Sequence, residues 1–406
     1  MPRPAGAESA LWQEWLAIAA AQVYTVYMSS ISRIPPPRES ASDGGHTPRL
    51  PSAIRGRGAA SNRDSRYLPT RSERKPAEEF ADERFPDPAI QTECRREVAR
   101  TIIARNRSPD IPFEQSINPY RGCEHGCIYC YARPSHAWLD LSPGLDFETR
   151  LTYKVNAAEL LDGQLRARGY QCKPITIGAN TDPYQPVEKR LGITRQVLEV
   201  LQRFRHPVSL ITKGNLIERD IDILSAMAAD GLASVAVSVT TLDRDLKRAL
   251  EPRTPEGNAR LATVQRLSEA GVPVSVLVAP VIPALNDSEL ETILRRARDA
   301  GALSAGYILL RLPLEIRDLF QEWLEEHYPL RAEHVMSLIR QSRGGADYDA
   351  RFGHRMRGTG AFADLLASRF DIACRKLGIN RREGAVDLDC SKFRVPEQHG
   401  DQFSLF

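Results

Sequence analysis

The stretch Asn118-Pro-Tyr-Arg-Gly-Cys-Glu-His-Gly-Cys-Ile-Tyr-Cys-Tyr131 places three cysteines in a C-x3-C-x2-C array. Thiolates at this spacing cannot all lie on one face of a helix, but a loop can wrap Cys123, Cys127 and Cys130 around one metal centre. Cysteine thiolate is the soft ligand that iron–sulfur clusters select. Three thiolates leave one iron of a four-iron cluster without a protein ligand, so that iron can bind and activate another molecule.

Two other interpretations of the three cysteines are a zinc knuckle and a set of unrelated thiols. Zinc usually takes four ligands, and the array has no nearby fourth cysteine. The regular pattern that follows the array favours the cluster over both alternatives.

Length and composition indicate a chain with a substantial core. Its 406 residues are 42% hydrophobic, which suits one large domain with extensions or two domains, and the formal net charge is +3. Four of the seven cysteines lie outside the array and form no second C-x2-C pair: Cys94, Cys172, Cys374 and Cys390. This scatter is not a disulfide framework, so it predicts a reducing cytoplasm, and it argues against a second cluster.

Residues 1–92 are predicted to form a mostly disordered, basic N-terminal region. Within it, Ala10–Met28 is a long apolar run with polar interruptions, which we interpret as an amphipathic helix or a non-native upstream start rather than a membrane anchor. Arg49–Lys75 is strongly basic, as in segments that contact phosphate backbones, although a solvated tail has the same composition. Gly56–Asn62 is small enough to pack against the core as an extended arm.

Residues 93–313 alternate between helical patterns and short apolar strands, and predict a core of about six βα units. The expected strands are Phe113–Asn118, Pro174–Gly178, Val208–Thr212, Ser234–Val239, Val274–Val278 and Gly306–Leu310. Their β-branched, nearly all-apolar composition indicates a parallel sheet that is buried on both faces. A doubly wound sheet and a complete eight-unit barrel would give the same alternation. Before the first strand, Cys94–Ile103 is expected to be a short helix.

Residues 314–406 lack this repeat and are predicted to form a helical extension that caps the core. Amphipathic patterns predict helices over Ile316–His327, Ala332–Gln341 and Ala361–Leu377.

The cysteine array, with Tyr129 before its last thiol and Tyr131 after it, resembles the signature of the radical S-adenosylmethionine (SAM) superfamily, and more narrowly the spore photoproduct lyase-like branch. The resemblance implies an α/β fold, a partial (β/α)6 TIM-type barrel, with one [4Fe-4S] cluster on Cys123, Cys127 and Cys130. It also implies that the open iron holds SAM and that the reduced cluster cleaves it to a 5′-deoxyadenosyl radical, which abstracts hydrogen from a substrate. Tyr129 and Tyr131 would relay or donate hydrogen.

Polar residues follow the expected strands at their carboxyl ends, where parallel folds place their chemistry. By position, the resemblance assigns Asn180, Thr181 and Asp182 to the amino group of SAM, although a structural turn is an alternative. It assigns Lys213 to the SAM carboxylate, a contact that suits a flexible ammonium, and the alternative is a strand-end charge in water.

The next two strand ends complete the expected SAM site. Ser238 and Thr240 point to the same face of their strand, and the resemblance assigns them to the ribose, although both also occur as ordinary strand residues. Arg253, in a proline-fixed loop, is a candidate to bind a carboxylate or phosphate. The resemblance assigns Val281 and Ile282 to the adenine.

One departure from the lyase branch lies at Ala179 and Asn180. Spore photoproduct lyases have a Cys-Thr-Ser-Asp-like sequence here, and its cysteine returns a hydrogen atom to the product radical. Cys172 lies before the strand, at the wrong end for this task. The resemblance therefore implies radical SAM chemistry without establishing the lyase reaction.

Nucleic acid, in a DNA-repair-like role, is the leading substrate class. Besides the basic arm, Arg351–Gly360 combines several arginines with an aromatic residue, as in phosphate and base contacts, although these arginines could instead pair with Asp347 and Asp349. The terminal Gln402-Phe-Ser-Leu-Phe406 resembles the peptide that bacterial replication and repair proteins insert into the sliding DNA clamp, although a hydrophobic terminus can also simply pack.

The partners expected from these features are an electron donor such as flavodoxin or ferredoxin, DNA and the bacterial sliding clamp, with no membrane. Two alternatives stay open: radical SAM modification of a protein or small metabolite, and a non-catalytic iron–sulfur clamp-binding factor.

Overall fold

The computed structural model describes residues 56–63, 65–67, 91–381 and 387–397. The apolar run Ala10–Met28, most of the basic segment Arg49–Lys75 and the terminal peptide Gln402–Phe406 lie outside these residues. The predictions made for them are therefore not addressed by the fold.

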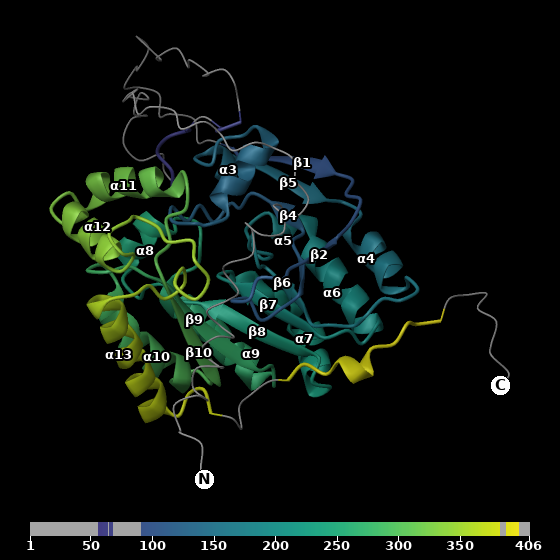
Figure 1. Cartoon of the computed structure of the whole chain (residues 1–406). Coiled ribbons are helices and arrows are strands. Elements are labelled where there is room, and N and C mark those ends of the chain that lie inside the picture. Colours follow the sequence, from purple (N-terminus) through teal and green to yellow (C-terminus); the bar gives the residue numbers. More distant parts are fainter. Residues whose placement is uncertain (1–55, 64, 68–90, 382–386, 398–406) are drawn as a thin grey trace, which may run out of the picture.

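A seven-stranded sheet forms the centre of the molecule, in the order β10-β9-β8-β7-β6-β3-β2 (Figure 1). Its strands are β2 (Ile103–Arg105), β3 (Gln115–Ile117), β6 (Ile175–Ile177), β7 (Val208–Thr212), β8 (Ala233–Ser238), β9 (Val274–Val281) and β10 (Ser304–Leu309). The strands from β3 to β10 pair in parallel, and β2 alone among these strands runs antiparallel. Because β8 is buried at every position, apolar side chains are required on both of its faces. The fold is the partial (β/α)6 barrel predicted from the alternation.

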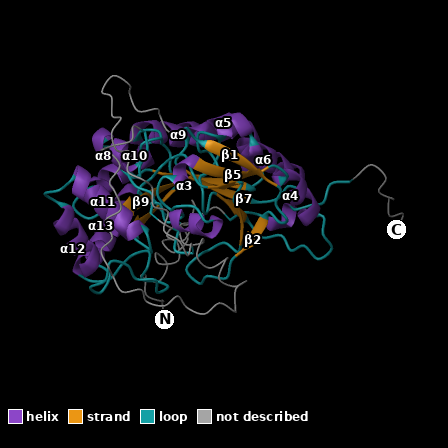
Figure 2. Ribbon diagram, turned by 90° about the horizontal axis from the view of Figure 1, so that it is seen from above, coloured by secondary structure: helices purple, strands orange, loops and turns teal. Residues whose placement is uncertain are grey.

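Helices pack outside these strands and form an arc around them (Figure 2). They are α4 (Ala157–Leu165), α6 (Ile193–Arg203), α7 (Ile221–Ala229), α9 (Gly257–Glu269) and α10 (Leu290–Asp299). Each buries an apolar stripe against the sheet; in α6, Val197, Leu198 and Leu201 are fully buried. This stripe follows the helical period, so it is continuous along one face.

A second, three-stranded sheet lies beside the barrel and consists of β1 (Glu93–Glu97), β5 (Arg150–Lys154) and β4 (Tyr120–Arg121). The helix expected over Cys94–Ile103 is therefore wrong, because this stretch begins with β1 and ends at the first residue of β2. β1 pairs in parallel with β5. A backbone partner that is distant in sequence outweighs a weak local helical preference.

The extension contains α11 (Ile316–His327), α12 (Ala332–Gln341) and α13 (Ala361–Leu377), with the predicted bounds. α13 packs against α10, and Arg369 forms an ion pair with Glu291 across this contact. α11 packs near α8 (Arg244–Leu250), a helix that the sequence pattern did not predict, and the indole nitrogen of Trp323 donates to the Ala249 carbonyl. The extension thus covers one end of the barrel.

Part of the N-terminal arm packs against the barrel, as expected for Gly56–Asn62. The backbone N–H groups of Gly58 and Ala59 each donate to the Glu148 carboxylate at 2.9 Å. A Cβ atom at position 58 would lie 1.8 Å from the Gly126 carbonyl oxygen, so only glycine allows this approach. Within the described residues, no helix has both the length and the apolarity to cross a membrane.

Candidate active site

The cysteine loop and the carboxyl ends of the parallel strands enclose a cavity of about 140 Å³. Cys123, Cys127 and Cys130 all line it. The loop is anchored at both ends of the array by backbone hydrogen bonds: Cys123 N donates to the Phe147 carbonyl at 2.9 Å and Ile128 N donates to the Leu250 carbonyl at 3.1 Å. The three thiols therefore share one pre-formed site.

A buried ion pair supports the loop from behind. The Arg133 guanidinium, which is fully buried, pairs with Glu148 and donates to the carbonyl oxygens of Cys127 at 2.9 Å and Gly126 at 3.2 Å. Glu148 also receives the arm residues Gly58 and Ala59. Arm, ion pair and cysteine loop are thus joined in one network.

The donor set fits an iron–sulfur cluster. Burial raises the pKa of each of the three thiols, so without metal they are neutral. Within the part of the chain that the structure describes, no three His, Cys, Asp or Glu side chains gather closely enough to hold a single ion. A four-iron cluster places each cysteine on a different iron, so its ligands stand farther apart than those of one ion.

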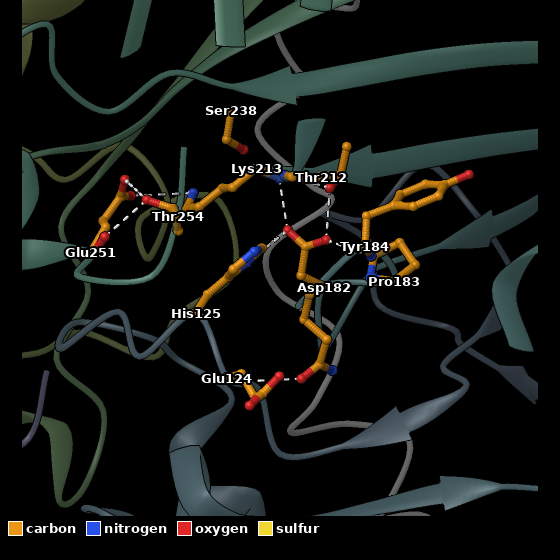
Figure 3. Close-up of polar contacts among 12 residues, drawn as sticks. Glu124, His125, Asp182, Pro183, Tyr184, Thr212, Lys213, Ser238, Glu251 and Thr254 are labelled. Carbon is orange, nitrogen blue, oxygen red and sulfur yellow. Dashed lines mark hydrogen bonds and ion pairs between the residues drawn. The ribbon is translucent and has the colours of Figure 1, made fainter. Parts of the chain in front are cut away.

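Asp182 ties the ends of β6 and β7 together at the cavity wall (Figure 3). It accepts hydrogen bonds from Thr212 Oγ1 and from the backbone N–H of Lys213, both at 2.7 Å, and its Oδ2 lies 3.3 Å from His125 Nδ1. Burial opposes ionisation of Asp182, but the neighbouring His125 and these hydrogen bonds lower its pKa below the usual value. Both carboxylate oxygens are therefore engaged by the protein.

Asn180 offers the acceptor that Asp182 does not. Its Oδ1 atom is buried and has no hydrogen-bond partner among the described residues, and the residue lines the cavity. A buried acceptor without a partner is costly, and an ammonium donor in the cavity would satisfy it. This chemistry fits the amino group of SAM.

Glu251 is the hub of a second buried network, which reaches Lys213 (Figure 3). Its carboxylate pairs with Arg260, accepts from Tyr129 Oη and from Thr240 Oγ1, and has Oε1 3.7 Å from Lys213 Nζ. Burial opposes its ionisation, but Arg260 and Lys213 hold the pKa of Glu251 well below its usual value. Burial and this carboxylate raise the pKa of Tyr129, so the phenol stays protonated.

Of the predicted residues, the cavity is lined by the three cysteines and by Tyr129, Tyr131, Asn180, Asp182, Lys213 and Ser238. Five predicted SAM contacts are not among its lining residues: Thr181, Thr240, Arg253, Val281 and Ile282. Their side chains have other partners.

Each of these five has a physical reason to lie elsewhere. Thr181 Oγ1 donates to the Tyr120 carbonyl, and the Thr240 hydroxyl donates to Glu251. Arg253 pairs with Glu124 at 3.3 Å rather than facing the cavity. Val281 and Ile282 are buried in the hydrophobic core, one residue or more beyond Ala279 and Pro280, which do line the cavity.

Sequence reasoning missed two cavity residues that carry functional groups, His125 and Arg311. His125 lies inside the cysteine array, where the metal pattern drew attention to the thiols alone. Arg311 follows β10 just as Lys213 follows β7, so a charge directly after an apolar strand was the available signal. The end of the sixth strand was not considered as a site.

A partial barrel that presents three thiols at its carboxyl end defines an iron–sulfur enzyme of the (β/α)6 class. The chain belongs to the radical SAM superfamily, whose sequence profile matches residues 117–297. Like other members, it is an enzyme that uses a [4Fe-4S] cluster and SAM and requires an electron donor.

Relatives are found in bacteria and archaea. An uncharacterized protein of Mycobacterium tuberculosis is 37% identical over 243 residues, which are 59% of this chain and 72% of the relative. One from Methanocaldococcus jannaschii is 27% identical over 213 residues, which are 52% of this chain and 76% of the relative. Spore photoproduct lyase complexed with a dinucleoside spore photoproduct is similar in fold, with a TM-score of 0.52 and 16% identity over 70% of this chain and 79% of that one.

Proposed function

We propose that Cys123, Cys127 and Cys130 hold the cluster and that SAM occupies the adjoining cavity. Asn180 accepts from its amino group, Lys213 pairs with its carboxylate and Ser238 contacts its ribose. The observation that carries this proposal is that all six side chains line one cavity at the carboxyl ends of the strands. Bound there, the reduced cluster and SAM supply a 5′-deoxyadenosyl radical for hydrogen abstraction from a substrate.

The experiment that tests this activity is anaerobic reconstitution of the full chain, followed by chemical reduction with SAM. We expect 5′-deoxyadenosine to form and the electron paramagnetic resonance signal of the reduced cluster to change when SAM is added. Absence of deoxyadenosine would contradict catalysis and favour the alternative of a non-catalytic iron–sulfur factor.

The cavity wall distinguishes the two tyrosines of the cysteine loop. The Tyr129 hydroxyl is held by Glu251, whereas Tyr131 Oη donates to the carbonyl oxygen of Ala179. Ala179 is where the lyase branch is expected to carry its cysteine. We therefore assign Tyr131 as the residue that relays or donates hydrogen, and Tyr129 as a residue that positions Lys213.

For this assignment we expect Tyr131→Phe to form deoxyadenosine within about twofold of the wild type but to lose about 100-fold in substrate turnover, a typical contribution of one proton-transferring group. Tyr129→Phe is the matched change one thiol away, and should mainly weaken SAM binding. Equal turnover by Tyr131→Phe and the wild type would contradict the assignment.

Nucleic acid is the substrate class that we propose, in a repair-like role. A cleft of about 710 Å³ adjoins the cavity, and Asn180 lines both. Its cationic side chains are Arg100, Arg105, Arg121 and Lys154. Arg121 pairs with Glu97, so the other three carry the excess charge. Burial lowers the pKa of Lys154 to about 8, which leaves it mostly charged at neutral pH.

The arginine-rich segment Arg351–Gly360 supports this substrate less than the cleft does. Arg351 pairs with Asp349, as the alternative interpretation had it, and Arg355 is buried in an ion pair with Asp110. Both arginines thus have carboxylate partners within the protein. The sliding clamp stays a predicted partner through Gln402–Phe406.

Reversing two cleft charges tests the substrate class. We expect Arg100→Glu with Arg105→Glu to weaken binding of a single-stranded oligonucleotide and to reduce the slope of log affinity against log salt by about 2, because about one counterion is released per phosphate contact. Fluorescence anisotropy at several salt concentrations measures both quantities.

The matched control is Arg168→Glu with Arg248→Glu, which reverses two exposed charges outside the cleft. Equal losses in the two double variants would show non-specific attraction only. Deoxyadenosine formation that is insensitive to intact or UV-irradiated DNA would contradict a nucleic-acid substrate and favour a protein or small metabolite.

A further inference from the structure

Arg311 lies at the end of β10, on the cavity wall formed by the last strand of the barrel. The residue is 7% exposed and lines the cavity. Its guanidinium carbon lies 5.9 Å from the ring centre of Tyr131 and 5.8 Å from that of Tyr348. Nη2 donates to Tyr348 Oη at 3.0 Å. Arg311 is therefore held between the cysteine loop and the C-terminal extension.

A second buried guanidinium stands behind Arg311. Arg343 is 3% exposed and donates to the carbonyl oxygens of Leu309 at 3.2 Å, Leu310 at 2.8 Å and His354 at 2.8 Å. Burial and the nearby charge of Arg311 lower the pKa of Arg343 to about 10, so both groups are charged at neutral pH. Carbonyl oxygens orient Arg343 but carry no net charge, so the pair adds positive potential to this wall.

The cavity's own carboxylate is engaged elsewhere. Among the described residues that line it, Asp182 is the one acid, and its oxygens accept from Thr212 and Lys213 at the ends of β6 and β7. Two cationic side chains, Lys213 and Arg311, line the same cavity. With Lys213 assigned to SAM, the charge of Arg311 calls for a second anionic group in the ligands.

We propose that Arg311, backed by Arg343, is a subsite for an oxyanion of the substrate, a phosphate of the nucleotide chain. This inference rests on the proposed function and adds the residue that places the substrate next to Tyr131. The planar guanidinium fork matches two phosphate oxygens at once. The rings of Tyr131 and Tyr348 flank the fork and offer faces on which a base beside that phosphate can stack.

The test compares Arg311→Gln and Arg311→Lys with Arg340→Gln. Arg340 lies in the same extension, and its side chain is 42% exposed, so its loss controls for a missing arginine outside the cavity. Thermal unfolding of the reconstituted full chain is measured anaerobically with inorganic phosphate, acetate or chloride at one ionic strength. We expect phosphate to raise the Tm of the wild type and Arg340→Gln by about 2 °C. Arg311→Gln should show no rise and Arg311→Lys a partial one.

A second measurement separates the substrate from SAM as the source of the anion. We expect Arg311→Gln to raise the oligonucleotide concentration for half-maximal turnover about 10- to 100-fold, as for loss of a charge-assisted contact. Its Kd for SAM and its substrate-free deoxyadenosine formation should stay within about twofold of the wild type.

Three outcomes would overturn the subsite. One is a phosphate shift of equal size in the wild type and Arg311→Gln. Another is weaker SAM binding in Arg311→Gln with an unchanged phosphate shift, which assigns the guanidinium to the SAM carboxylate. The third is an acetate shift as large as the phosphate shift, which indicates a carboxylate ligand. Should Arg311→Gln fail to fold, Arg311→Lys carries the same comparison, because it keeps the charge and loses the fork. A wild type that forms no deoxyadenosine refutes the proposed function instead.

Discussion

The variants Cys123→Ala, Cys127→Ala and Cys130→Ala are each expected to lose the cluster and to form 5′-deoxyadenosine only at background level. All three thiols line one cavity, and removal of one leaves two protein ligands for a four-iron cluster. The visible absorption of the reconstituted protein and its iron content report cluster loss directly, and deoxyadenosine yield reports activity. The change is local, because alanine fits where each thiol stands.

The matched control for these variants is Cys94→Ala. Cys94 lies in β1, is half-buried like Cys130 and is not among the residues that line the cavity. It should keep the full iron content and deoxyadenosine yield. A Cys130→Ala protein that retained a complete four-iron cluster and full activity would refute the assignment of the three ligands.

Replacement of Glu251 by glutamine should destabilise the fold by about 3–5 kcal/mol, the usual cost of leaving one partner of a buried ion pair without its counter-charge. Glu251 is fully buried and the Arg260 side chain is 1% exposed, so water cannot replace the lost carboxylate. The same change removes the acceptor for Tyr129 and the carboxylate beside Lys213. Urea unfolding measures the free energy, and SAM affinity should fall in parallel.

The pH dependence of unfolding gives a second measure of Glu251. Its pKa is lower in the folded protein than in the unfolded chain, so its stabilising contribution is complete above the unfolded value of about 4.3. That contribution decreases as the pH falls toward the folded-state pKa. Glu251→Gln should therefore lack the part of the acid destabilisation that wild type shows below about pH 4.

Two variants frame this prediction. Glu256→Gln removes an exposed pair with Arg244 and should cost less than about 1 kcal/mol. Glu251→Leu combined with Arg260→Met removes both buried charges and should recover much of the stability lost by Glu251→Gln. A Glu251→Gln protein as stable as Glu256→Gln would show that the buried network contributes little.

Local patterns predicted most of the barrel because its strands and helices are continuous apolar runs and stripes. The strand Val208–Thr212 and the three extension helices have the predicted bounds. β1 was missed because a strand at the edge of a small sheet has few apolar residues: three of its five positions are exposed. Its existence depends on β5, which lies far away in sequence.

The amino-acid sequence by itself determined the chemistry of this protein: three thiols in one loop, followed by an ordered series of polar strand ends. These features are local, since ligand spacing and strand composition do not depend on distant contacts. Only the tertiary structure decided which side chains face the cavity and which partners they take. It paired Glu251 with Arg260 rather than Arg253, engaged Thr240 in that network and brought Arg311 beside Tyr131. Such choices depend on packing between elements that are distant in sequence, and no residue pattern encodes that packing locally.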